Sequence, residues 1–404
     1  MERRSFIKTS AVVAGLGLLK PAILSASVLE KPVKIGFIGC GNRGTGVIST
    51  MSENNNIHIT ALADLFRNQI DNALPKINQL NNNRNYAAVA EKNIYTGHDA
   101  YQRLLLDSDT DAVLISTPAY AHPFIFEAAV AAGKHVYCEK PAAPDVYGTL
   151  RMLKAAANVK NLSLVCGFQI RYASTYGEMV RQIQQGAIGD IVSVQLYYNS
   201  SETPRKTQLD SADDEFRIRN HFHFLSLSGG ILNDQGIHML DVCNWALQSK
   251  PMYAVGMGGK KGGMDFGDIF TNYQVLYKYP NDIHASIQTS QVGPSFGDVC
   301  ARFIGTDGYA EAHYDGGVFI RGKHEWDSGV VNSTLFDSNI NKSKSFIQSI
   351  ESGQYLNQIE SACESTLTAI LGREAAFQDK TISWEQLIAS NQRSDPQLNL
   401  SKFK

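Results

Sequence analysis

Residues 33–44 read VKIGFIGCGNRG, a short apolar run that ends in three closely spaced glycines. The apolar run predicts a buried strand, and a helix is expected from Val47 onward. Gly39 permits a tight turn between them, Gly41 lets backbone N–H groups approach a pyrophosphate, and Gly44 allows close packing of the helix. The helix N-terminus points its dipole toward the anion. A strand, a glycine turn and a helix in this order predict a dinucleotide-binding site.

A second apolar run, Ile57 to Ala63, ends at Asp64, twenty residues after Gly44. An acidic side chain at this spacing accepts hydrogen bonds from the ribose of an adenosine. It would also repel the additional phosphate of NADP, so the expected cofactor is NAD. Asn42 and Arg43 lie in the glycine turn and can add side-chain donors. A plain glycine turn is the alternative interpretation, and the flanking strand and Asp64 favour dinucleotide binding over it.

The chain beyond this run continues to alternate helices and strands. Helices are expected at 66–83, 100–106, 124–132 and 146–157, and strands at 112–116, 134–138 and 163–166. The strand at 112–116 is apolar almost throughout, which is typical of a parallel strand buried on both faces. Ligands bind at the edge of such a sheet where the strands end. The strand ends on that edge are Gly39, Asp64, Thr117, Lys140 and Gly167.

The second half of the chain has a different pattern. Residues 191–199 alternate apolar and polar positions, which predicts a half-buried strand. Further strands are expected at 273–278, 283–289, 300–305 and 308–314, and closing helices at 344–353 and 359–377. Turns rather than helices separate these strands, so they predict a large, mostly antiparallel open sheet. The expected fold class is α/β. Its parts are a Rossmann domain at 33–158, an α/β substrate domain at 159–345, and closing helices with a tail at 346–404.

The first 27 residues predict an export signal. Arg3 and Arg4 precede an apolar run at 11–19, which is shorter than the ~20 residues needed to cross a bilayer. The arrangement resembles a twin-arginine signal, although Glu2 stands where that pattern usually has Ser or Thr. An ordinary secretory leader and an uncleaved anchor are the alternatives. The twin-arginine interpretation predicts a periplasmic protein without a stable membrane anchor.

The composition excludes some classes of function. The formal net charge is −2, so no basic surface for nucleic acid is expected. The 6 cysteines are scattered without a CxxC spacing, and we interpret them as buried small hydrophobic residues. A chain of 404 residues is long enough for two domains that each bury a core.

The chemistry is expected around a segment that begins at Gly229-Gly230. This segment should enter a helix in which Asp234 and His238, four residues apart, share one face. Oxidation of an alcohol needs a base for the hydroxyl proton, and an imidazole with a pKa near ~6.5 suits that role. Asp234 would orient His238 and favour its protonated form, while Lys140 would stabilise alkoxide character on the reacting oxygen. The alternative is a helix-capping aspartate and a core histidine.

Four motifs together resemble the Gfo/Idh/MocA oxidoreductases. They are the glycine fingerprint, Thr117-Pro118 followed by His122, Glu139-Lys140-Pro141, and the segment from Gly229-Gly230 to His238. The resemblance covers nearly the whole chain after the leader. It implies a Rossmann domain, a second domain with a large open sheet, and a nicotinamide cofactor between them. It also implies that Thr117, Pro118, His122, Glu139 and Lys140 contact the cofactor. A homo-oligomer formed through the open sheet is expected.

Other polar residues are weaker candidates for substrate binding. Arg171 and Tyr172 follow a predicted strand at the domain junction and could bond substrate hydroxyls, or form a structural ion pair. His221 and His223 would point to one side of an extended segment, which can indicate a metal site. No third ligand is placed nearby, so no metal is predicted, and a sugar-contacting loop is the preferred interpretation.

Three functions are compatible with these motifs. The first is an exported oxidoreductase acting on a sugar, polyol or glycoside. It would keep its NAD bound and recycle it, because free dinucleotide is scarce outside the cytoplasm. The second is a glycosidase, because the chain also resembles a glycosidase branch of the same family. Such an enzyme oxidises a ring hydroxyl transiently, eliminates the aglycone and adds water. That branch lacks an acid four residues before its histidine, so Asp234 favours the first function. The third is a binding protein without catalysis, against which Lys140, Asp234 and His238 argue.

Overall fold

A computed structural model of the chain describes residues 31–294 and 297–404. Pro32–Lys404 form one compact unit. The predicted export signal at 1–27 lies outside the described residues. The predicted boundaries near 158 and 345 stay predictions, since contacts do not divide this unit further. Among the helices of the described ranges, none is both long and apolar enough to cross a membrane.

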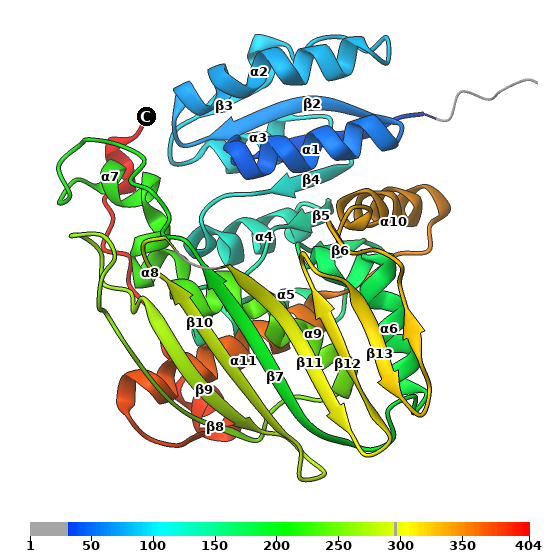
Figure 1. Cartoon of the computed structure of the whole chain (residues 1–404). Helices are drawn as coiled ribbons and strands as arrows, with labels where there is room; N and C mark the ends of the chain where they lie inside the picture. The colour runs from blue at the N-terminus through cyan, green and yellow to red at the C-terminus, as the bar shows by residue number, and fades with distance from the viewer. Residues whose placement is uncertain (1–30, 295–296) are drawn as a thin grey trace, which may run out of the picture. The chain divides into compact units, whose positions relative to one another are not determined.

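The first half of this unit builds a six-stranded sheet with the order β3-β2-β1-β4-β5-β6 (Figure 1). All its strand pairs are parallel. The strands are β1 (Val33–Ile38), β2 (Ile57–Asp64), β3 (Ile94–Thr96), β4 (Ala112–Ile115), β5 (His135–Cys138) and β6 (Leu164–Cys166). The helices between them are α1 (Asn42–Asn54), α2 (Arg67–Asn82), α3 (Ala100–Asp107), α4 (His122–Ala131) and α5 (Val146–Ala156). The predicted Rossmann architecture is confirmed.

Helix α1 begins at Asn42, five residues before the predicted start at Val47. The glycine turn is therefore shorter than expected, and Gly44 already lies inside the helix. A Cβ atom on Gly44 would lie 2.6 Å from the carbonyl oxygen of Gly39 and 2.6 Å from the ring of Phe37. Only glycine allows the helix to approach β1 this closely, as the fingerprint predicts.

The second half builds a nine-stranded sheet with the order β14-β13-β12-β11-β7-β10-β9-β8-β15. The strands are β7 (Ile191–Ser200), β8 (Tyr253–Gly259), β9 (Asn272–Lys278), β10 (His284–Gln291), β11 (Asp298–Gly305), β12 (Gly308–His313), β13 (Val318–Gly322), β14 (Trp326–Asp327) and β15 (Ile382–Ser383). The pair β7 and β10 is parallel, and the other pairs are antiparallel. The prediction of a large, mostly antiparallel sheet is confirmed.

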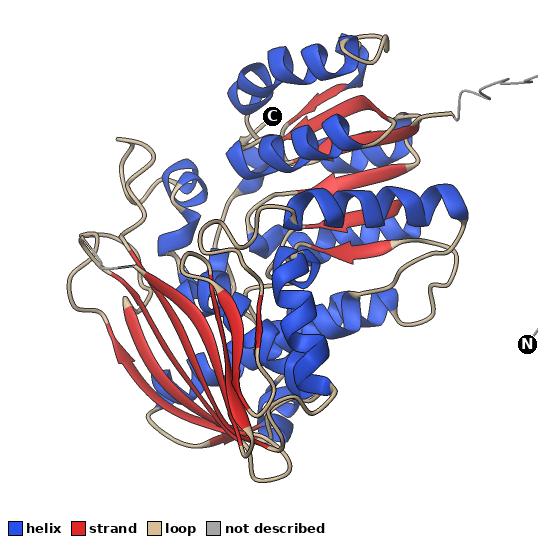
Figure 2. Cartoon of the chain, turned by 45° about the vertical axis from the view of Figure 1, so that its right-hand side comes forward, coloured by secondary structure: helices blue, strands red, loops and turns tan. Residues whose placement is uncertain are grey.

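Helices cover one face of the large sheet (Figure 2). They are α6 (Ser174–Gln184), α9 (Ile237–Leu247) and α11 (Ile359–Gln378). Helix α11 contacts β8 and β9, α9 contacts β7 and β11, and α6 contacts β12 and β13. The strands alternate accordingly. In β12, Ala310 and Ala312 belong to the core under the helices, whereas Tyr309 is 42% exposed on the opposite face. We call that opposite face of the nine-stranded sheet the open face.

The remaining α-helices all follow β7 in the chain. They are α7 (Asp214–Arg219), α8 (Leu225–Ser228), α10 (Ser338–Ser352) and α12 (Trp384–Ser390). Helix α10 packs against α1 of the Rossmann sheet. The last residues also return to that sheet, where the ring of Phe403 packs edge-on against Phe66 at 5.3 Å. The C-terminal segment therefore belongs structurally to both halves.

Candidate active site

A cleft of about 990 Å³ runs along the carboxyl ends of the Rossmann strands. Its volume is at the upper end of the range for small-molecule and cofactor sites. Both halves of the chain line it. The residues predicted for the site that line the cleft are Gly39, Gly41, Asn42, Arg43, Asp64, Thr117, Pro118, Glu139, Lys140, His221, Asp234 and His238. Most of the predicted groups therefore surround one cavity.

The glycine turn and Asp64 form one hydrogen-bonded unit. Gly39 has a φ of 88°, and a Cβ atom there would lie 2.6 Å from the carbonyl carbon of Ser116. The carboxylate of Asp64 accepts hydrogen bonds from the backbone N–H of Cys40 at 2.7 Å and of Phe66 at 2.9 Å. Burial raises the pKa of Asp64 to about 6. Asp64 therefore fixes the turn and still faces the cleft, where a ribose hydroxyl can donate to it.

The loops after β4 and β5 are tied together by His122. Its Nε2 lies 2.7 Å from the carbonyl oxygen of Thr117, and its Nδ1 lies 2.8 Å from that of Pro141. His122 is 1% exposed and does not line the cleft, so it braces these loops instead of contacting the cofactor as predicted. The buried hydroxyl of Thr117, by contrast, has no hydrogen-bond partner among the described residues and lines the cleft. It is free to bond a cofactor.

Glu139 is a buried carboxylate at the end of β5. Arg43 of the fingerprint helix donates to it at 3.0 Å. The ammonium group of Lys342 on α10 lies 4.8 Å from the ring centroid of Tyr137. Burial lowers the pKa of Lys342 to about 8, and the charge of Glu139 opposes this shift. Lys342 carries no sequence signal, because nothing in a helix near the C-terminus indicates that it returns to the Rossmann sheet.

Lys140 pairs with Asp234 across the cleft. Its ammonium group donates to the backbone carbonyl oxygen of Asp234 and lies 3.4 Å from the carboxylate oxygen Oδ1. Asp234 lies in a π turn, Leu232–Gly236, which precedes α9. Such a turn has more residues than a regular helical turn and often marks a functional site. It replaces the regular helix that was predicted there. No hydrogen bond between Asp234 and His238 is found in the described ranges, so the acid positions Lys140 instead of the imidazole.

His238 is 5% exposed at the floor of the cleft. Its ring stacks near Tyr198 and meets Phe168 edge-on, with centroid distances of 6.3 Å in both cases. Its Nδ1 atom is buried without a hydrogen-bond partner within the described chain. Burial, and then the positive charge of Lys140, hold the pKa of His238 well below its usual value of 6.5. A neutral imidazole at neutral pH can accept a proton from a substrate hydroxyl.

Among the two predicted pairs of substrate residues, His221 lines the cleft and the other three residues do not. Arg171 donates to the buried carboxylate of Asp241 at 2.8 Å and, like Tyr172, does not line the cleft. His221 and His223 lie in a short 3₁₀ helix and not in an extended segment. His221 lines the cleft, and burial lowers its pKa to about 4. His223 packs edge-on against Phe266 at 4.9 Å.

The C-terminal tail also reaches the cleft, and no sequence pattern predicts this. Arg393, Ser394, Asp395, Pro396 and Leu400 line it. The backbone N–H of Ser394 donates to Asp145 at 2.6 Å, which fastens the tail to the Rossmann half. Gln169 lines the cleft as well. No motif marks these positions, because their role depends on where the tail is folded back.

Comparisons with known proteins agree with this architecture. Residues 33–168 match the family model described as the oxidoreductase family with an NAD-binding Rossmann fold, GFO_IDH_MocA. Residues 176–311 match the GFO/IDH/MocA C-terminal domain.

Two curated relatives and one solved structure show the range of related proteins. Inositol 2-dehydrogenase 2 of Saccharopolyspora erythraea is 25% identical over 285 residues, which cover 70% of this chain and 73% of the relative. Glycosyl hydrolase family 109 protein 1 of Shewanella sp. (strain MR-4) is 28% identical over 241 residues, which cover 55% of this chain and only 51% of the hydrolase. The aldose-aldose oxidoreductase from Caulobacter crescentus, complexed with glycerol, has a TM-score of 0.69 at 18% identity, covering 87% of this chain and 99% of the other. The last likeness shows a shared fold.

Proposed function

The chain belongs to the Gfo/Idh/MocA oxidoreductase family, and from this we propose that it oxidises a hydroxyl group of a sugar, polyol or glycoside with NAD. The observation that carries the proposal is the placement of Lys140 and His238 in the cleft that the glycine fingerprint opens. Relatives named for inositol oxidation support the substrate class. The cleft offers aspartate, lysine and histidine side chains that suit a polyhydroxy compound.

The site residues have distinct roles in this reaction. Asp64 and the glycine turn hold the adenosine and pyrophosphate parts of the dinucleotide, whose nicotinamide supplies a hydride acceptor when bound. His238 accepts the hydroxyl proton at its neutral imidazole. Lys140 donates a hydrogen bond to the same oxygen and stabilises its developing negative charge. An ammonium group has three donors, so Lys140 can keep its bonds to Asp234 while it contacts the substrate.

A redox glycosidase is the second candidate, and the family 109 hydrolase relative favours it. The same base and the same cofactor would oxidise a ring hydroxyl transiently and acidify the neighbouring C–H. Asp234 favours the oxidoreductase, because the glycosidase branch that the chain resembles lacks an acid at this position.

Ultraviolet absorbance of the purified protein distinguishes the two candidates. Free sugars that produce bound NADH would support the oxidoreductase. Release of an aglycone from glycosides without net reduction of NAD would support the glycosidase and contradict the first candidate.

We propose further that the cofactor stays bound and is recycled in place. The tail at 393–396 lines the cleft and is fastened through Asp145, and these contacts support a tail that slows dissociation of the dinucleotide. A protein that retains its NAD can act where free NAD is scarce. This agrees with export through the twin-arginine route to the periplasm, which the first 27 residues indicate.

Replacing Arg3 and Arg4 by Lys should leave the protein in the cytoplasm, and undiminished export would contradict that route.

A further inference from the structure

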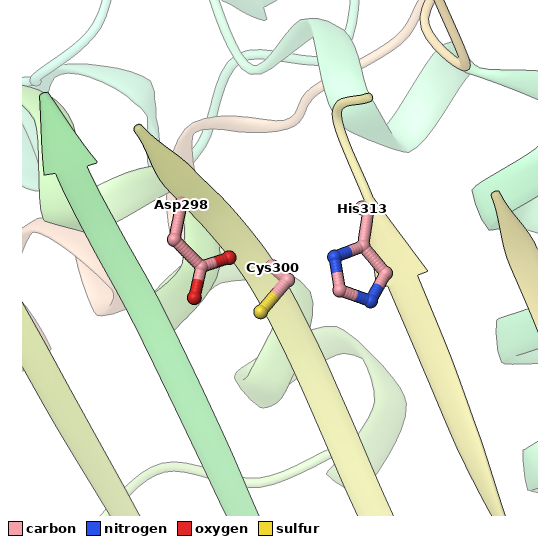
Figure 3. Close-up of side chains that lie close together, drawn as sticks. All are labelled: Asp298, Cys300 and His313. Carbon is pink, nitrogen blue, oxygen red and sulfur yellow. The ribbon is translucent and has the colours of Figure 1, made fainter. Parts of the chain in front are cut away.

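Three potential metal-binding side chains lie together on the open face, far along the chain from the fingerprint. They are Asp298 and Cys300 of β11 and His313 of β12 (Figure 3). Cys300 and His313 are direct partners across the antiparallel pair, and Asp298 lies two residues before Cys300. Residues two apart in a strand share a face, so all three side chains project to the same side. Their neighbours Ala301 and Ala312 point into the core instead.

The donor atoms of this cluster are close enough for one cation. A carboxylate oxygen, the thiol sulfur and a ring nitrogen all lie within 4.8 Å of one another. Donors of a tetrahedral zinc ion are separated by roughly 3.3–3.8 Å, because the metal–ligand distances are about 2.0–2.3 Å. Small side-chain rotations therefore bring the three atoms to bonding distance.

A carboxylate holds the ring of His313 from behind, as is usual for metal-binding histidines. Its Nε2 atom lies 3.0 Å from the carboxylate of Glu311, and Arg302 in turn donates to Glu311 at 3.0 Å. This contact leaves Nδ1, which faces Cys300 in Figure 3, as the free ring nitrogen. A carboxylate behind a ligating imidazole fixes the ring and increases its basicity. The network of Arg302, Glu311 and His313 thus prepares Nδ1 as a ligand.

From this geometry we propose that Asp298, Cys300 and His313 bind one Zn²⁺ ion, or a divalent ion of similar softness, on the open face. The combination of thiolate and imidazole selects zinc-like ions over Ca²⁺ and Mg²⁺, which take oxygen ligands. Three protein ligands leave one tetrahedral position for water. The ion would join β11 to β12 and lies outside the catalytic cleft, so the inference does not depend on the proposed function.

The charge of the cluster is compatible with a cation. Asp298 contributes a carboxylate to the cluster. Binding of the ion replaces the proton of the Cys300 thiol, which passes to solvent, and the resulting thiolate is neutralised by the metal.

Cobalt provides a direct test, because Co²⁺ bound to a thiolate absorbs in the near ultraviolet. We expect untagged protein to give this absorption at one Co²⁺ per chain, and Zn²⁺ to displace it. Cys300→Ser should abolish the band. His324→Ala, which removes an exposed histidine of the same half, should leave it unchanged. All six cysteines of the chain are buried, so an unspecific exposed thiol does not produce the signal.

A second variant keeps the test independent of folding effects at a buried cysteine. Glu311→Gln retains all three ligands and removes the charge behind His313, and it should weaken Zn²⁺ binding about 10- to 100-fold. Retained NAD shows that each variant is folded. Absence of the cobalt–thiolate band in the unmodified protein, its persistence in Cys300→Ser, or one ion shared by two chains would overturn the proposal.

Discussion

At the residue scale, the site is dominated by the positive charges around His238. Lys140, Arg43 and Lys342 all depress the pKa of the imidazole, in addition to its burial. His238 and Lys140, which the sequence predicts as site residues, both line the cleft. It could not predict the partner of Asp234, because spacing along a regular helix does not anticipate the π turn.

The pH dependence of hydride transfer follows from these charges. His238 must be neutral to act as a base, so the rate of NAD reduction should stay level as the pH falls to 6.5 and decline only below it. Lys342→Met removes one positive charge and should raise the pKa of His238, which moves the decline to higher pH. Lys344→Met, two residues away on the exposed side of α10, is the matched control. Single-turnover rates of NAD reduction, measured across pH, test this. If the rate declined at the same pH in both variants, the account would be contradicted.

Asp64 should control the affinity for NAD. Loss of a hydrogen bond to a charged group weakens binding roughly 10- to 100-fold, and we expect this of Asp64→Ala. Because the pKa of Asp64 is raised to about 6, the carboxylate is lost as the pH falls through 6, and NAD binding should weaken there in the unchanged protein. Calorimetric titration measures both effects, and Asp71→Ala on the exposed side of α2 is the control. Equal affinity for NADP in the unchanged protein would show that the role of Asp64 has been misassigned.

At the element scale, strands and helices with a strong periodicity were predictable and the connections between distant elements were not. The parallel strands of the Rossmann half were located within a residue or two, because a short, uninterrupted apolar run between turn residues is typical of a buried strand. Four strands of the large sheet were missed. Strand β8 contains three glycines, which hide its alternation, and β13 has only five residues. Strands β14 and β15 have two residues each, which carry no periodic signal. The path of the tail was missed for a different reason. Residues 391–404 have no regular pattern, and contacts such as that of Phe403 with Phe66 arise only in the folded chain.

The tail is expected to retain the cofactor. A chain that ends at Asn391 loses Arg393 and the other tail residues of the cleft, and we expect NAD to dissociate about 10-fold faster, which corresponds to ~1.4 kcal/mol. Arg393→Ala in the full-length chain should produce part of this effect without changing the length. Stopped-flow displacement of bound NADH measures the rate. Unchanged dissociation in the shortened chain would remove the structural support for a retained cofactor.

At the scale of the whole molecule, the open face exposes apolar side chains that one chain does not cover. Tyr253, Val255 and Met257 of β8 are 38%, 40% and 67% exposed, and Leu276 of the adjacent β9 is 57% exposed. A contiguous apolar surface of this kind indicates a protein interface. The sequence predicted a homo-oligomer through the open sheet, and these exposures support that proposal.

A charge placed on this surface should separate the subunits. Met257→Lys is expected to shift the protein to a smaller assembly in sedimentation experiments, because association would bury the ammonium group. Leu106→Lys is the matched control, since Leu106 is 82% exposed but lies on α3 of the Rossmann half. A monomeric unmodified protein, or equal assembly of both variants, would show that the open face is not the interface.

The central claim is that His238 removes the substrate proton while Lys140 stabilises the oxygen. The most direct measurement is the single-turnover reduction of bound NAD by a competent sugar, because it isolates the chemical step from product release. His238→Ala should reduce NAD ~10²- to 10⁴-fold more slowly, and Lys140→Ala ~10²- to 10³-fold more slowly, with NAD still bound in both. His284→Ala, on the open sheet, should react at the unmodified rate. Reduction at the unmodified rate in His238→Ala would contradict the account and make the histidine a structural residue.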